Sequence, residues 1–97
     1  MTDLDDISES ERKLIGSVTE GVIEAVFRWG VIVDLGLSRV GLIDALYIDE
    51  ASHYLPGELV RCHLDDFDEM KGKFILRPMG QIPLMERLRD AGYRPGG

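Results

Sequence analysis

The chain has little cysteine, few basic residues and no long apolar run, and each shortage narrows the class of protein. Cys62 is the only cysteine among 97 residues, so an internal disulfide is excluded and a cytoplasmic location is expected. No stretch reaches the roughly 18 apolar residues of a membrane-spanning helix, so no membrane partner is expected. The opening residues MTDLDDISESERK lack the basic and apolar regions of a signal peptide. One small cytoplasmic domain is therefore predicted.

Basic residues are outnumbered throughout most of the chain. The sequence has 11 Lys and Arg against 18 Asp and Glu, which gives a net charge of −7. Residues 14–80 alone carry eleven acids and six bases. Such a balance argues against long-range attraction to a phosphate backbone, although a local basic patch is still compatible with it.

Catalytic and metal-binding patterns are also missing. Cys62 and His63 are adjacent in a predicted strand, so their side chains point to opposite faces and cannot hold one metal ion together. There is no glycine-rich phosphate loop, and DDFDE lacks the alternate-position ligands of a calcium loop. We therefore expect a non-catalytic protein without a metal or other cofactor.

What the chain does have is a series of short apolar segments separated by glycine, proline and polar turns. Five strands are predicted between Ile15 and Arg77, in the segments GSVTEGVIEAVF, GVIVDLG, GLIDALYI, ELVRCHLDDF and FILRP. The polar stretch DEASHY is expected to form a short helix or a loop between strands three and four. This layout predicts an all-β fold, a five-stranded Greek-key OB-fold barrel, with an SH3-like barrel as the alternative.

The predicted barrel spans residues 14–80 and has a different segment on each side. Residues 1–13 form an acidic N-terminal segment in which Ser8 and Glu11 have the spacing of a capping box, but a frayed, solvated tail is favoured. Residues 81–97 contain PLMERLRDAG, where Leu84 and Leu88 are four residues apart, so a short C-terminal helix is predicted. That helix is expected to pack on the barrel or on a partner.

The order of short motifs in residues 16–77 resembles the S-one RNA-binding domain, an OB module named after the largest protein of the small ribosomal subunit. The motifs are GSVTEGVIEAV, then WGVIVDLG, then GLI at residues 41–43 and GELV at residues 57–60. In this family an aromatic residue stands at the position of Trp29, a second aromatic at Ile32, and a histidine near Asp44. The resemblance implies an OB barrel that binds RNA on the face of strands two and three.

Strand periodicity and the resemblance together define a candidate binding site. Val31, Val33 and Leu35 are expected to fill the barrel, while Ile32 faces outward. Trp29 is interpreted as a platform for base stacking, with Gly30 allowing a base or backbone to approach closely, and core packing of Trp29 is the alternative. The candidate binding residues are Trp29, Ile32, Arg28, Arg39, Asp44, Arg61, Lys71 and Lys73. The arginines could instead pair with nearby acids.

Two functions remain open on these grounds. The first is weak, salt-sensitive binding of RNA or single-stranded nucleic acid on the face of strands two and three. The alternative is an acidic protein–protein interaction module, an adaptor or immunity-like protein, that uses the same face for a basic protein partner. The replacement of an aromatic by Ile32 and of a histidine by Asp44 favours this alternative, because a carboxylate repels phosphate.

Overall fold

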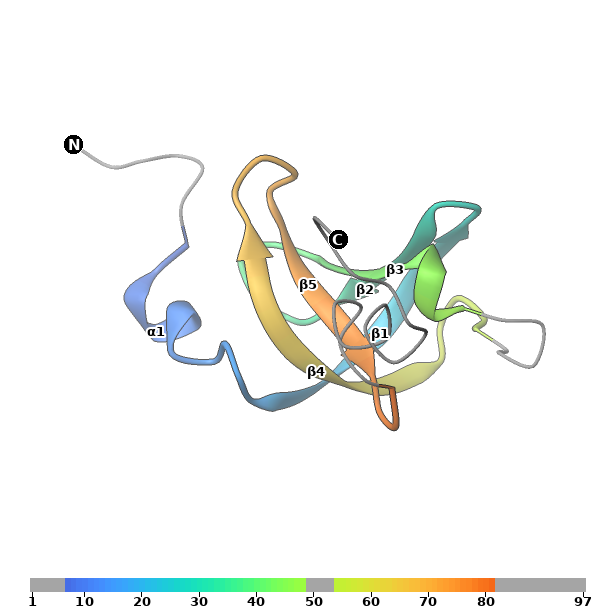
Figure 1. The fold of residues 1–97 in the computed structure, drawn as a ribbon, viewed down its shortest axis with the longest axis horizontal. Helices are drawn as coiled ribbons and strands as arrows, with labels where there is room; N and C mark the ends of the chain where they lie inside the picture. The colour runs from blue at the N-terminus through green and yellow to red at the C-terminus, as the bar shows by residue number, and fades with distance from the viewer. Residues whose placement is uncertain (1–6, 49–53, 82–97) are drawn as a thin grey trace, which may run out of the picture.

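The protein folds into a closed barrel of five strands, as a computed structural model shows for residues 7–48 and 54–81 (Figure 1). Two long strands, β1 (Val18–Phe27) and β4 (Leu59–Asp68), wrap around the barrel. Three shorter strands complete it: β2 (Gly30–Asp34), β3 (Gly41–Asp44) and β5 (Lys73–Pro78). The five predicted strands are confirmed, and the architecture is all-β.

The strand order identifies the barrel type. Neighbours around the barrel follow the order β1-β2-β3-β5-β4, and β4 closes the barrel by pairing with β1. All pairings are antiparallel except that of β3 with β5, which is parallel. This is the five-stranded Greek-key arrangement of an OB fold, so the predicted fold class is confirmed and the SH3-like alternative is wrong.

The barrel is filled by side chains that alternate along each strand. Val31 and Val33 are fully buried in the core, and Ile32 between them is not part of the core cluster. Phe67 and Phe74 meet edge to face, with ring centroids 5.1 Å apart, on the paired strands β4 and β5. Tyr47 is buried in the same core, and Tyr54 packs against it. The predicted division of β2 into an inner and an outer face is therefore correct.

Two irregularities bend the long strands. The register of β1 shifts between Ile23 and Ala25, and that of β4 shifts between Leu64 and Asp66. Gly21 of β1 lies outside the irregular stretch and serves close packing instead. A Cβ atom there would lie 2.4 Å from a side-chain carbon of Val33, so only glycine fits between β1 and β2.

The segment before the barrel differs from the predicted solvated tail over its described part. Helix α1 (Glu9–Arg12) begins with a complete capping box between Ser8 and Glu11, and Ile7 is buried in the barrel core. The Glu11 carboxylate also accepts hydrogen bonds of 2.7 Å from both the backbone N–H and the hydroxyl of Ser38. These contacts attach α1 to the loop between β2 and β3.

Two predicted helices fall largely outside the described residues. Between β3 and β4 the described part contains a single 3-10 turn, η1 (Ala45–Tyr47), and residues 49–53 are outside it. The C-terminal helix predicted in PLMERLRDAG, residues 83–92, also lies outside the described residues. The proposed boundaries of the tail, barrel and C-terminal segment therefore stay predictions.

Candidate nucleic-acid interface

The turn between β1 and β2 presents two stacked aromatic rings. Phe27 ends β1, and its ring lies 4.7 Å from that of Trp29 with an angle of only 7° between the ring planes. The side chains are 47% and 53% exposed, respectively. The alternative interpretation of Trp29 as a core residue is therefore wrong. We call Phe27, Arg28, Trp29 and Gly30 the aromatic tip.

Gly30 holds the aromatic tip against β3. Its φ is +155°, and a Cβ atom would lie 2.5 Å from the carbonyl oxygen of Ile43 and 2.7 Å from a methyl carbon of Leu42. The space that the missing side chain leaves is therefore occupied by β3 of the same chain. We had expected this space to admit a base or a backbone, and the structure shows that it does not.

A strip of apolar side chains crosses the outer surface of the barrel next to the aromatic tip. The register places Ile32 of β2 beside Leu42 of β3, and Leu42 beside Ile75 of β5. These three residues, the outer strip, are not part of the core cluster, yet Ile32 is 8% exposed and Leu42 only 4%. The predicted outward direction of Ile32 is correct, but little of its side chain is accessible to a ligand.

Asp44 has a structural partner within its own turn. Its carboxylate accepts a hydrogen bond of 2.9 Å from the backbone N–H of Leu46 and so caps η1. The residue also pairs with Gly30, so it lies at the same end of the β2–β3 face as the aromatic tip. The Asp in this position therefore explains why the third strand ends there.

The basic residues of the candidate site are spread over the barrel. Only Arg28 belongs to the aromatic tip. Arg39 lies before β3, at the opposite end of that strand, where a guanidinium nitrogen approaches the Cβ position of Gly72 at 3.4 Å. Lys71 lies in the β4–β5 turn and Lys73 begins β5, and the Lys73 ammonium donates to the carbonyl of Lys71.

Arg61 occupies a third location, exposed on β4 opposite Glu20 of β1. The structure therefore does not bring Arg28, Arg39 and Arg61 together around Trp29.

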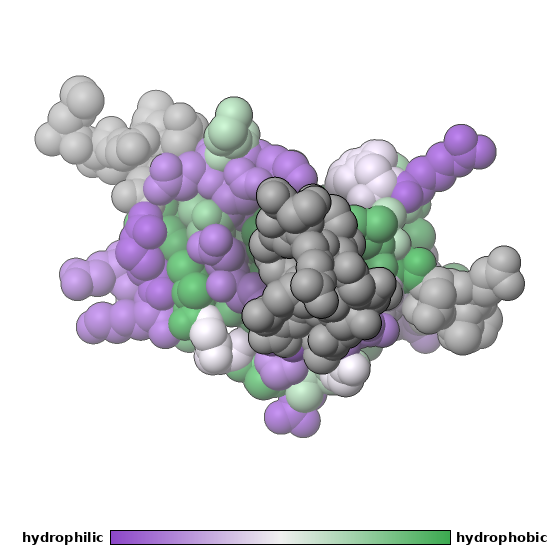
Figure 2. Space-filling model, viewed as in Figure 1, coloured by the Kyte–Doolittle hydropathy of each residue, from purple (hydrophilic) through white to green (hydrophobic). Residues whose placement is uncertain are grey.

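Figure 2 shows many hydrophilic side chains at the end of the barrel with α1 and the β4–β5 turn, and hydrophobic ones around the ends of β2 and β3.

Cys62 cannot serve this surface, because it is fully buried in the barrel core. Burial, followed by the nearby Asp65 carboxylate, raises the pKa of the Cys62 thiol to about 11. Its neighbour His63 is half-buried and pairs with Val18 of β1 and Arg77 of β5.

The described residues contain no cluster of three or more His, Cys, Asp or Glu side chains able to hold a metal ion. Nor do residues 7–48 and 54–81 include a helix long and apolar enough to cross a membrane.

Two residues of the interface were missed by sequence reasoning. Phe27 supplies a second aromatic ring, but from the strand before Trp29 instead of from position 32. The only signal in the sequence was the closeness of the two aromatic residues in FRWG, because Phe27 pairs with Gly30 and Trp29 lies within the two-residue turn between them. Leu42 was assigned only to a motif, although its neighbours Gly41 and Ile43 face inward and Leu42 must face outward.

Comparisons with known proteins agree with this fold. None of the protein-family models and none of the curated protein sequences matches the chain. Among solved structures, an uncharacterized protein from Methanocaldococcus jannaschii is 18% identical with a TM-score of 0.57, covering 72% of this chain and 93% of that one. GSP13 from Bacillus subtilis is 23% identical with a TM-score of 0.55, over 79% of this chain and 69% of its own.

Mycoplasma genitalium RNase R, in complex with ribose-methylated single-stranded RNA, is 20% identical with a TM-score of 0.60. The match covers 69% of this chain but only 13% of RNase R, so this chain corresponds to a small part of that protein. At such low identities the similarities show the fold alone. This chain has the OB fold that its resemblance to S-one domains implies.

Proposed function

We propose that this protein binds single-stranded RNA, with the aromatic tip as the platform on which a base stacks. The observation that carries the proposal is the parallel stack of Phe27 and Trp29, both about half exposed. Phe27 covers one face of the indole ring and limits its motion. A base can then stack on the open side of the pair at little further cost in side-chain entropy.

Two further facts support this choice of ligand. OB barrels generally bind oligonucleotides on the face that includes β2 and β3, and the aromatic tip lies at the end of that face. The structure of RNase R, a small part of which is similar to this chain, contains bound single-stranded RNA. The low number of cations at the tip supports an interaction that depends more on stacking than on charge.

The proposal is tested by measuring the affinity of fluorescein-labelled single-stranded RNA by anisotropy in 50 mM salt. Trp29→Ala is expected to weaken binding between about fivefold and a hundredfold, because stacking on an aromatic contributes about 1–3 kcal/mol per base. Phe27→Ala is expected to weaken it as well, since the indole loses its support.

Leu59→Ala is the matched control for these variants. Leu59 is also an exposed apolar residue, at 75% exposure, but it lies on β4 beside Val22 and outside the aromatic tip. Its substitution should leave the affinity unchanged. Equal losses in all three variants, or no measurable binding by the folded parent protein, would refute the proposed platform.

A second candidate function is binding of a basic protein on the same surface. It is favoured by Leu46, which is 67% exposed in η1 beside the Asp44 carboxylate and extends the apolar surface near the tip. Apolar residues close to acids suit a basic protein partner better than a phosphate backbone. If RNA fails to bind and a defined basic protein is retained by the parent but not by Trp29→Ala, this function replaces the first.

A further inference from the structure

Three apolar side chains form an exposed patch where β1 pairs with β4, away from the aromatic tip. The register places Val22 of β1 beside Leu59 of β4, and their exposed fractions are 39% and 75%. Leu55, at the start of the turn before β4, is 60% exposed. We call these three residues the β1–β4 patch. Single exposed apolar residues are ordinary on a protein surface, but neighbouring ones usually mark an interaction site.

Hydrogen bonds fix the patch by joining the turn before β4 to β1. The backbone N–H groups of Gly57 and Ile23 donate to the carbonyls of Ile23 and Glu58, respectively, both over 2.8 Å. Within the turn, the backbone N–H of Glu58 donates to the carbonyl of Leu55, and the Glu58 carboxylate accepts from the backbone N–H of Leu55, both over 3.1 Å. Leu55 and Leu59 are therefore presented by a turn that lies fixed against β1, so little ordering is needed when a partner binds.

Four exposed carboxylates, which we call the acidic rim, border the patch: Glu20, Glu24, Asp34 and Glu58. Glu20 and Glu24 stand two residues before and two residues after Val22 on β1. Asp34 of β2 pairs with Val22 on the side away from β4, and Glu58 directly precedes Leu59. The apolar patch is therefore bordered by negative charge on three neighbouring strands.

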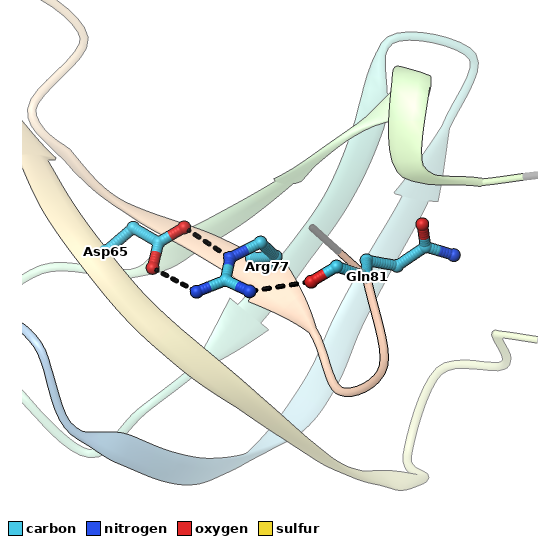
Figure 3. Close-up of polar contacts among 3 residues, drawn as sticks. All are labelled: Asp65, Arg77 and Gln81. Carbon is cyan, nitrogen blue, oxygen red and sulfur yellow. Dashed lines mark hydrogen bonds and ion pairs between the residues drawn. The ribbon is translucent and has the colours of Figure 1, made fainter. Parts of the chain in front are cut away.

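The nearest described basic residues do not neutralise the acidic rim. Arg61 of β4 pairs with Glu20 and so faces only one of the four carboxylates. Arg77 of β5 lies on the far side of β4, and its guanidinium is already occupied. It donates to both carboxylate oxygens of Asp65, over 2.9 and 3.2 Å, and to the carbonyl oxygen of Gln81 over 2.6 Å (Figure 3).

These charges decide what kind of partner suits the β1–β4 patch. A nucleic acid or an anionic membrane would bring phosphates against the acidic rim, and a second copy of this chain would bring a second acidic rim. A basic protein supplies the complementary charge. The patch and its rim extend over two inter-strand spacings, or about 10 Å, which is close to the width of a single helix with its side chains.

We propose that the β1–β4 patch binds an amphipathic helix of a basic protein. Apolar side chains of that helix cover Leu55 and Leu59, while its lysines or arginines contact the acidic rim. Val22 lies five residues before Phe27 on β1, or about 16 Å from it along the strand. The proposal is therefore independent of RNA binding and of the second candidate function, because both of those use the aromatic tip.

The binding is tested with a synthetic peptide of leucine and lysine in amphipathic helical spacing, titrated into the nitrogen-15-labelled full chain. Amide signals of Val22 and Leu59 should shift saturably, and the same peptide with glutamate in place of lysine should leave them unchanged. Absence of binding by the basic peptide overturns the proposal. Shifts at Gly30 and Leu46 in place of Val22 and Leu59 would assign the peptide to the aromatic tip and overturn it as well.

Two pairs of matched variants separate the patch from the overall negative charge. Leu59→Gln should weaken peptide binding about tenfold, because a leucine covered by a partner loses its exposure to water, whereas Met70→Gln, at a 98% exposed residue of the β4–β5 turn, should not. Glu24→Gln should weaken binding about twofold to threefold, and Glu69→Gln in the β4–β5 turn should not. Equal losses for the two glutamate variants would show that net charge alone attracts the peptide, which overturns the proposal.

Sedimentation of the free protein tests the remaining occupant, a second copy of the chain. We expect the parent and Leu59→Gln to sediment alike, because two acidic rims repel each other. A dimer of the parent that Leu59→Gln dissociates would assign the β1–β4 patch to self-association and overturn the proposal.

Discussion

At the scale of single residues, Gly30 connects the aromatic tip to the barrel. Its backbone adopts a positive φ of 155°, and the Ile43 carbonyl lies where a Cβ atom would be. Gly30 also allows Leu42 to pack against the outer face of β2. Both the position of the aromatic tip and the packing of Leu42 in the outer strip therefore require glycine at position 30.

Gly30→Ala should destabilise the protein by about 2 kcal/mol or more, because backbone strain and the contact with Ile43 act together. Gly36→Ala is the control, since its φ is +70° but no atom lies within 4 Å of the added Cβ position. That control should cost about 1 kcal/mol from strain alone. Urea unfolding followed by circular dichroism measures both, and equal losses would contradict the assigned close contact.

The buried thiol of Cys62 makes a prediction about chemical reactivity and pH. Because burial raises its pKa to about 11 from an ordinary value of 9.0, the native thiol should react with Ellman's reagent at pH 8 far more slowly than the urea-unfolded chain. The raised pKa stabilises the fold fully below pH 9, and this contribution is lost as the pH rises from 9 to 11. Rapid labelling of the native protein at pH 8 would contradict the burial.

At the scale of elements, the Glu11 carboxylate joins α1 to the loop between β2 and β3, in addition to the packing of Ile7 in the core. Hydrogen bonds from the backbone N–H of Ser38, and then from its hydroxyl, lower the pKa of Glu11 below its ordinary value of 4.5. A lowered pKa stabilises the folded form above pH 4.5, and this contribution disappears as the pH falls through the folded pKa. The attachment of α1 should therefore weaken in acid.

Glu11→Gln should lower the free energy of unfolding at pH 7 by about 1 kcal/mol, because the capping box and the charged contact to Ser38 are both weakened. The difference from the parent protein should be smaller at pH 3 than at pH 7. Glu9→Gln, which alters a neighbouring carboxylate outside the capping box, should show no such loss at pH 7. A loss for Glu11→Gln that is the same at both pH values would contradict the role of the charge.

The strands could be predicted from sequence because each has a period of two and is bounded by glycine or proline. Val31 and Val33 point inward for this reason, and the residues between them point outward. The end of β3 could not be predicted, because the GLIDALYI run continues apolar past Asp44, and only the cap on Leu46 ends the strand there. Local hydrogen bonding overrode the apolar pattern.

The contacts between distant parts of the chain were predicted less completely than the strands, because they join residues far apart in sequence. Asp65 pairs with Arg77 across a bulge that no periodicity of the sequence reveals. The contact between Glu11 and Ser38 spans 27 residues. In contrast, Trp29 was correctly placed beside β2, because its turn is local.

At the scale of the whole molecule, the distribution of charge determines how RNA can bind. Arg28 is the one basic residue in the aromatic tip, while Arg39, Lys71 and Lys73 lie at the other end of β3. Each phosphate contact to a single strand contributes a slope of about −0.7 to the dependence of log affinity on log salt concentration, so contact through Arg28 alone predicts a slope of about −0.7. Raising the salt fourfold should then weaken binding only about threefold.

The most direct test of RNA binding at the aromatic tip uses the fluorescence of Trp29, the one tryptophan in the sequence. Single-stranded RNA of mixed sequence is titrated into the full chain at 50 and 200 mM salt. We predict saturable quenching at both concentrations, with a threefold weaker affinity at the higher one, since stacked bases quench indole directly. An unchanged emission spectrum in a protein shown to be folded would contradict the assignment of the Phe27–Trp29 pair as a base-stacking platform.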